Sequence, residues 1–162
     1  MQTERARGAV VDFFWEWLGL YQLENLSLDD ETFPEFDGRM RRDLVTSTRR
    51  FLETAIWEDD AYESLMLGHF GFVNDRIAPL FGVPAPGSEQ MQRVELSATE
   101  RRGILTQPGW LAATSHGIGH SPIFRGVKVL DRVLCSPAPP PPPEVLDSVG
   151  GPADDPEICT TR

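Results

Sequence analysis

Five consecutive prolines at 139–143 constrain the fold of this chain more than any other feature. Proline has no backbone N–H and a fixed φ, so neither an α-helix nor a central β-strand forms across such a run. Eight of the 14 prolines lie between Pro137 and Pro156. The sequence therefore predicts an extended tail over 137–162 and confines the folded part to residues 1–136.

The size of the chain bounds its architecture. With 162 residues and 40% hydrophobic composition, it is long enough to bury roughly two-thirds of its unfolded surface without disulfides. This length suits one modest domain or parts of two. We expect a fragment of a longer protein.

Charge and hydropathy exclude two classes of partner. The 15 Lys and Arg against 25 Asp and Glu leave a net charge of −10, which repels phosphate backbones and anionic lipid. No stretch approaches the 18 apolar residues of a membrane span, and the N-terminus lacks the basic and then apolar run of a signal peptide. We therefore predict neither a nucleic-acid partner nor a membrane span.

Helical periodicity dominates the first half. Residues 3–20 predict a helix ended by Gly19, and 39–57 predict a second one capped by Asp37, with its arginines on a solvated face. A short helix through Leu67 and another one that is capped by Asn74 and ends at Gly82 follow, with a kink at Pro79. In the first helix, the stripe predicted to be buried comprises Val10, Phe13, Phe14, Trp17 and Leu18.

The second half is less regular. We interpret 91–96 as a connector rather than a strand, and expect a helix over 98–106 and a turn that starts at Pro108. Ser121 and Pro122 then give a cap and a first-position proline for the most clearly defined helix. Its apolar stripe comprises Ile123, Val127, Leu130 and Leu134.

Together these elements predict an all-α fold: a compact bundle of five or six helices with an extended proline-rich C-terminal tail. We divide the chain into a helical part at 1–90, a second helical part at 91–136 packed on it, and the tail at 137–162. The four tryptophans all fall on helical stretches, which favours the core or its rim over a sugar-binding platform.

The two cysteines, Cys135 and Cys159, bracket the tail. In an oxidising compartment they could form a disulfide that closes a loop of about 25 residues; the alternative is two free thiols. Neither cysteine lies in a C-x-x-C motif, so this chain itself contains no redox dithiol and no covalent haem attachment site.

The stretch from Ser115 to Arg125 holds the few weak candidates for catalysis. His116 and His120 are four apart, but the glycines between them argue against a zinc-binding helix, and no third ligand is identifiable. Ser121 beside these histidines lacks a nucleophile elbow, and Arg125 with Gly126 suits a close helix contact or a carboxylate clamp. The acidic residues between Asp29 and Asp37 lack the spacing of a calcium loop. We assign no catalytic, metal or cofactor-binding residue, and loop hydrogen bonding is the favoured role of the histidines.

Several short motifs, in one order, resemble a domain of unknown function in large planctomycete and myxobacterial proteins. They lie at 14–20, 33–37, 72–78 and 81–82. The motifs at 102–107, 121–122, 125–126 and 134–135, which lead into the proline run, look like the start of the next uncharacterised domain in those proteins. The chain thus resembles the end of the first domain and the start of the second.

The resemblance implies context rather than activity. In such proteins the proline run precedes a C-x-x-C-H haem-attachment segment, and the whole is exported to the periplasm or the cell surface. It therefore implies an oxidising compartment, which favours the disulfide. It also implies a c-type haem downstream in the parent protein, with none in this chain.

We expect a non-catalytic helical module of an exported multidomain protein. Its partner would be the rest of the parent chain, where it would position the haem-bearing segment. The alternative is a periplasmic hydrolase or polysaccharide-acting enzyme that uses the loop at 115–125. A third possibility is a ligand for a proline-recognition domain, through residues 137–143.

Overall fold

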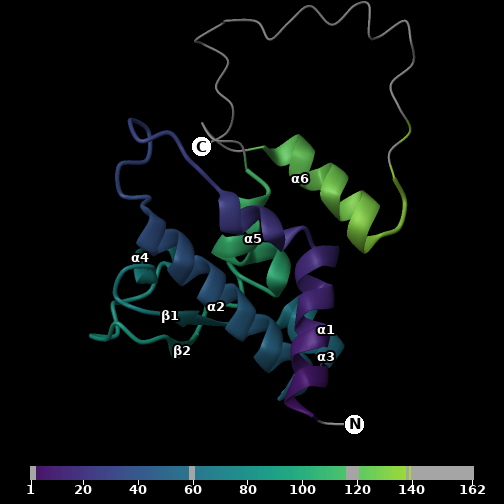
Figure 1. Cartoon of the computed structure of the whole chain (residues 1–162), viewed down its shortest axis with the longest axis horizontal. Coiled ribbons are helices and arrows are strands. Elements are labelled where there is room, and N and C mark those ends of the chain that lie inside the picture. Colours follow the sequence, from purple (N-terminus) through teal and green to yellow (C-terminus); the bar gives the residue numbers. More distant parts are fainter. Residues whose placement is uncertain (1–2, 59–60, 116–120, 138, 140–162) are drawn as a thin grey trace, which may run out of the picture.

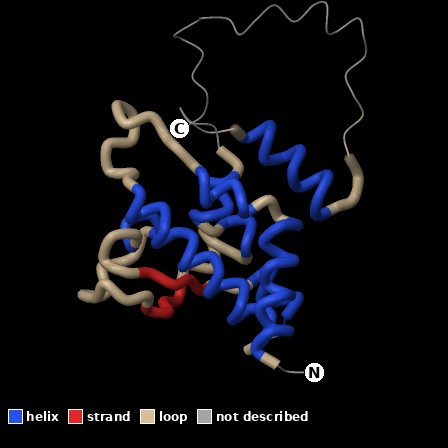
Figure 2. The backbone as a smooth tube through the Cα atoms, in the orientation of Figure 1, coloured by secondary structure: helices blue, strands red, loops and turns tan. Residues whose placement is uncertain are grey.

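The computed structural model describes residues 3–58, 61–115, 121–137 and 139. Within that part the chain is largely helical and carries one small sheet (Figures 1 and 2). The α-helices are α1 (Glu4–Trp17), α2 (Gly38–Trp57), α3 (Ala61–Leu67), α4 (Ala78–Phe81), α5 (Pro108–Ala113) and α6 (Pro122–Lys128). Short 3-10 segments form η1 (Leu20–Asn25) and η2 (Ile104–Thr106), and α6 continues into a π-helical segment, η3 (Val129–Val133). The predicted tail lies almost wholly outside these residues.

The sheet corrects the all-α prediction. Strands β1 (Phe70–Val73) and β2 (Gln92–Glu95) pair antiparallel, with Phe70 opposite Glu95 and Val73 opposite Gln92. Residues 91–96, interpreted above as a connector, therefore contain a strand. Its alternation is weak because most of its residues are exposed, so no apolar pattern marks it.

Side chains bond the outer edge of this sheet. The carbonyl of His69 accepts a hydrogen bond from Leu96 N and therefore points toward β2. Carbonyl directions alternate along a strand, so the carbonyls of Phe70 and Phe72 point away from β2. On that outer side, Ser47 Oγ donates to Phe72 O at 2.6 Å and Gln107 Nε2 donates to Phe70 O at 2.8 Å. Two buried polar side chains thus satisfy carbonyls that a third strand would otherwise bond.

Helix α2 is the centre of the core, as its periodicity predicted. Asp37 caps it by accepting hydrogen bonds from the backbone N–H groups of Arg39 and Met40, at 2.9 and 2.7 Å. Its buried face contacts α1, η1, α3, β1 and α5. The fully or almost fully buried residues on this face are Leu44, Ser47, Thr48, Phe51, Leu52 and Ala55.

The arginines of α2 are more than a solvated face. Arg49 Nη1 lies 2.8 Å from Asp12 Oδ1 on α1, and its guanidinium carbon lies 4.3 Å from the centre of the Trp15 ring. Arg41 Nη1 donates to Leu26 O at 2.9 Å, and Arg50 Nη1 donates to Met91 O at 3.3 Å. These side chains connect α2 to α1, to the end of η1 and to the segment before β2.

The buried stripe of α1 is displaced from the predicted one. Val11, Trp15 and Leu18 are buried, whereas Phe13 is 61% exposed. Seven of the nine residues at 10–18 are apolar, so the predicted stripe and the observed one both fit a helical period. Packing of α1 against α2 decides which of the two is buried. Gly19, with φ of 73°, follows the helix as predicted.

Three local predictions after α3 have different outcomes. The Asn74 side chain accepts from Arg76 N and Ile77 N before α4, as expected for a cap. Pro79 causes no kink, because it lies in the first turn, where no intrahelical N–H bond is required. The helix predicted at 98–106 is wrong: a single turn leads to Gly103, which has φ of 60°, and only η2 follows.

The last helix begins at Pro122, but its surface differs from the prediction. Ile123, Val127, Leu130 and Leu134 are 83%, 41%, 37% and 60% exposed. Val129 and Val133, which lie outside this stripe on the same segment, are partly buried and pack against the core. Figure 1 shows α6 at the edge of the molecule, beside α5. In the described part of the chain, no helix is both long enough and apolar enough to cross a bilayer.

Gly103 provides a test of this packing. A Cβ there would overlap the backbone of Met66 at the end of α3, and the residue also has positive φ. We expect Gly103→Ala to lower the free energy of unfolding by about 3 kcal/mol, measured by urea denaturation.

Gly8→Ala is the matched control, because Gly8 lies in α1 with open space around it. It should stabilise the protein by about 0.5–1 kcal/mol. Equal effects of the two substitutions would contradict this role of Gly103.

Candidate functional site

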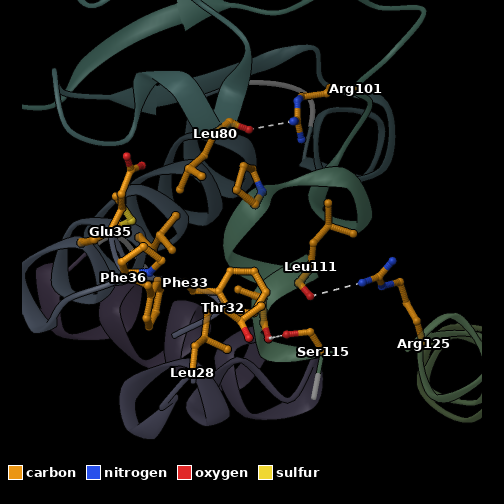
Figure 3. A pocket seen from close by; sticks show the side chains of 15 residues that line it. Leu28, Thr32, Phe33, Glu35, Phe36, Leu80, Arg101, Leu111, Ser115 and Arg125 are labelled. Carbon is orange, nitrogen blue, oxygen red and sulfur yellow. Dashed lines mark hydrogen bonds between the residues drawn. The ribbon is translucent and has the colours of Figure 1, made fainter. Parts of the chain in front are cut away.

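An apolar pocket of about 620 Å³ is the candidate functional site (Figure 3). It lies between the loop that precedes α2 and the surface of α5, and it reaches α4 and α6. The loop contributes Leu28, Thr32, Phe33, Pro34, Glu35 and Phe36. The helices and the segment before η2 contribute Met40, Leu44, Leu80, Arg101, Pro108, Leu111, Ala112, Ser115 and Arg125.

The loop wall is held by carboxylates that bond to the backbone. Asp29 Oδ2 accepts from Thr32 Oγ1 at 2.6 Å and from Thr32 N at 2.8 Å. These two hydrogen bonds hold the pKa of Asp29 below its ordinary value, and the bond from the Thr32 side chain has the larger effect. At the other end, the hydrogen bond from Met40 N is the main cause that lowers the pKa of the Asp37 cap. Both carboxylates therefore stay ionised and fix the loop that carries Phe33 and Phe36.

The opposite wall is α5. Pro108 occupies its first turn, where a missing N–H costs nothing, and Leu111 and Ala112 line the pocket. Its C-terminal hydroxyls bond to the helix itself: Thr114 Oγ1 donates to Trp110 O at 2.7 Å, and Ser115 Oγ donates to Ala112 O at 2.8 Å. Ser115 is thus committed to a local hydrogen bond.

Two arginines reach the pocket from different segments. Arg101 donates from Nη1 to Thr106 O at 3.0 Å and from Nη2 to Leu80 O at 2.7 Å. Arg125 of α6 donates from Nε to Thr114 Oγ1 at 3.2 Å and from Nη2 to Leu111 O at 3.3 Å. Figure 3 shows both arginines on the α5 side and Glu35 on the loop side.

The charges of these arginines have no acidic partner within the described residues. Every hydrogen bond that each guanidinium makes there ends on a neutral oxygen, and neither side chain forms an ion pair. A second hollow, of about 660 Å³, differs in this respect, because acidic and basic side chains mix in its lining and Arg76 Nε lies 2.9 Å from Asp43 Oδ2. Within the described part of the chain, the two arginines of the apolar pocket therefore carry positive charge that no ion pair neutralises.

The sequence-based candidates are only partly brought together. Arg125 lines the pocket, while Ser121 is buried at the N-cap of α6 and makes no side-chain capping bond. His116 and His120 lie outside the described residues, and so does Cys159. Cys135 is exposed just after η3, and its pairing stays a prediction. Among the described residues, no group of three His, Cys, Asp or Glu side chains could hold a metal ion.

Sequence reasoning missed most of this pocket. Residues 29–37 were interpreted as a solvated acidic loop, although Phe33 and Phe36 flank Pro34 and Glu35 there. Two aromatic residues within an acidic stretch were the available signal, because a fully solvated loop gains nothing from them. No sequence pattern marked Arg101 as a pocket residue, because its position depends on hydrogen bonds to the backbone carbonyls of Leu80 and Thr106, which only the tertiary structure brings near it.

Residues 1–83 match the family model PSD4, a protein of unknown function (DUF1592). This match covers just over half of the 162 residues. The chain belongs to the PSD4 family. Residues 101–162 match a second model, PSCyt3, also a protein of unknown function (DUF1588). The prediction of two adjoining domains of unknown function is therefore confirmed. No curated protein and no solved structure matches the chain.

The pocket lies across the junction of the two matched segments. Its lining from Leu28 to Leu80 belongs to the PSD4 segment, and its lining from Arg101 to Arg125 belongs to the PSCyt3 segment. Ligand sites occur preferentially where such units meet, because side chains from both converge there. Neither segment alone would form this cavity.

The Asp37 cap predicts a pH dependence. Because its pKa is lower in the folded chain, its stabilising contribution is present at neutral pH and is lost as the pH falls below about 4. We expect Asp37→Ala to lower the melting temperature clearly at pH 7 and much less at pH 3, measured by circular dichroism. Asp37→Asn keeps a capping oxygen without a titrating charge, so its deficit at pH 7 should be smaller. An equal deficit of Asp37→Ala at both pH values would contradict this account.

Proposed function

We propose that this PSD4-family chain is a non-catalytic helical module of an exported protein, and that it positions a c-type haem segment that follows in the parent chain. When bound, a c-type haem supplies electron transfer. The chain itself contains no C-x-x-C-H motif, so its contribution is a surface and a fixed exit direction for the polypeptide.

The observation that carries this proposal is the apolar stripe on α6 and η3. Four aliphatic side chains, Ile123, Val127, Leu130 and Leu134, follow one another at helical spacing and are all exposed. Contiguous exposed apolar side chains are characteristic of surfaces that another protein segment covers. A stripe of this kind in the last described helix favours a partner that follows in the chain.

The proline run supports the same arrangement. Five prolines in polyproline II conformation would span about 16 Å at roughly 3.1 Å per residue. A stiff run of this length sets the direction in which the chain leaves α6, and the covalent connection raises the effective concentration of the segment that follows, so even a weak apolar contact with α6 would form. The family resemblance supplies the haem and the exported context of the proposal.

The proposal predicts that the haem segment and the module reorient together. The test uses the parent protein through its haem segment and measures the rotational correlation time of each part by ¹⁵N NMR relaxation. We expect one shared time in the unaltered protein and a several-fold shorter time for the haem segment in the double variant Ile123→Ser, Val127→Ser. Phe13→Ser is the matched control, because Phe13 is 61% exposed, between Val127 at 41% and Ile123 at 83%, but lies on α1, and it should change nothing.

Two results would overturn this proposal. One is independent tumbling of the haem segment in the unaltered parent protein. The other is a gene that encodes no C-x-x-C-H motif after residue 162.

A hydrolase or polysaccharide-acting enzyme is the second candidate function. It is favoured by one observation: Ser115 and Arg125, at the two ends of the loop in question, both line the apolar pocket. It requires His116, His120 or Ser121 to act on a substrate bound there. Alanine substitution of at least one of these three residues should then reduce hydrolysis by the parent protein at least about 100-fold, with an unchanged melting temperature. Full activity in all three variants would exclude this candidate.

A further inference from the structure

We infer that the pocket between the loop at 28–36 and α5 binds an apolar molecule with a single carboxylate, such as a medium-chain fatty acid. This inference does not depend on the haem. It rests on the size of the cavity, its apolar lining and its two arginines.

The cavity has the dimensions and the surface of a ligand site. Its volume of about 620 Å³ lies within the roughly 300–1,000 Å³ that is typical of small-molecule pockets. Leu44, Leu80, Leu111, Phe36 and Met40 supply aliphatic and aromatic surface on several sides. An alkyl chain in this space would remove apolar area from water on both partners, which is the main source of favourable free energy for such ligands.

In this inference Arg125, beside Leu111, holds the polar end of the ligand, and Arg101, beside Leu80, adds positive charge at another part of the lining (Figure 3). A guanidinium has five N–H donors, and Arg101 and Arg125 each use only two of their nitrogens on protein oxygens. Those bonds fix the planar groups at the pocket without neutralising them. A carboxylate matches the geometry of the guanidinium fork and supplies the missing negative charge.

The remaining charges favour one carboxylate over a more highly charged anion. Glu35 is the acidic side chain in the lining, on the loop side, and the whole chain has a net charge of −10. Both features repel a dianion such as a phosphate monoester. A single carboxylate at Arg125, with its apolar chain directed into the pocket, is repelled least.

Calorimetric titration of the whole chain with three probes of equal chain length tests this inference. The probes are dodecanoate, dodecanol and dodecylammonium, each below the concentration at which it aggregates. We expect dodecanoate to bind at least about tenfold more tightly than dodecanol, because a charged hydrogen bond to arginine is worth more than a tenfold change. Dodecylammonium should bind most weakly.

Variants then locate the site. Arg125→Gln should weaken dodecanoate about tenfold and leave dodecanol unchanged, whereas Ala112→Phe, which fills the cavity, should weaken both. Arg102→Gln is the matched control: Arg102 is exposed, bonds to Ala98 O and does not line the pocket. Thermal unfolding of each variant verifies that it is folded.

Three results would overturn the inference. They are no binding of dodecanoate at millimolar concentration, equal affinity for dodecanoate and dodecanol, and an Arg102→Gln effect as large as that of Arg125→Gln. The first two need no variant, so they stand even where a substitution prevents folding. None of them bears on the joint reorientation of the haem segment, which is measured separately.

Discussion

Burial of one face of α2 is the interaction on which the rest of the structure depends. Leu44, Phe51 and Leu52 are almost completely removed from water, and α1, η1, α3, β1 and α5 all pack on this face. The buried residues of the described part of the chain form one core cluster, so the short segments that pack on α2 are stabilised by covering this face. The Asp37 cap matters for the same reason: it fixes where this helix begins and therefore where the loop at 28–36 returns to the body.

Buried hydrogen bonds join the two family segments. Ser47 on α2 and Gln107 before α5 bond to successive outward carbonyls of β1, and Gly103 donates to Gly68 O. The bonds of Gln107 and Gly103 connect the PSCyt3 segment to the PSD4 segment, whereas the Ser47 bond lies within the PSD4 segment. The pocket lies at this junction, so its shape depends on contacts that neither segment makes alone. Arg101 and Arg125, which form no ion pair within the described residues, are held there by hydrogen bonds to neutral oxygens such as the carbonyls of Leu80 and Leu111.

Particular residues show how far sequence reasoning reached. The bounds of α2, the Asp37 cap and the start of α6 follow from local chemistry, and the structure confirms them. Asn74 caps the turn that leads into α4, while Ile77 is the N-cap of α4 itself and makes no side-chain capping bond. Strand β2 was not predicted, because only one of its four residues is even partly buried and its sequence therefore shows no clear apolar alternation. The helix predicted over 98–106 fails because Gly103 is needed at positive φ against the backbone of Met66, a contact 37 residues away. Of the candidate site residues, Arg125 lines the pocket, but the loop aromatics and Arg101 were not recognised.

The sequence by itself determined where α2 begins and ends and where α6 begins, since capping side chains and prolines act on their own neighbours within a few residues. It also determined the adjacency of two uncharacterised domains, which is carried by the order of short motifs. Only the tertiary structure decided which of two apolar stripes of α1 is buried, that the stripe of α6 stays exposed, and that two arginines from distant segments line one apolar pocket. Periodicity shows that a helix has an apolar side, but which side is covered depends on the neighbours that the whole chain brings to it.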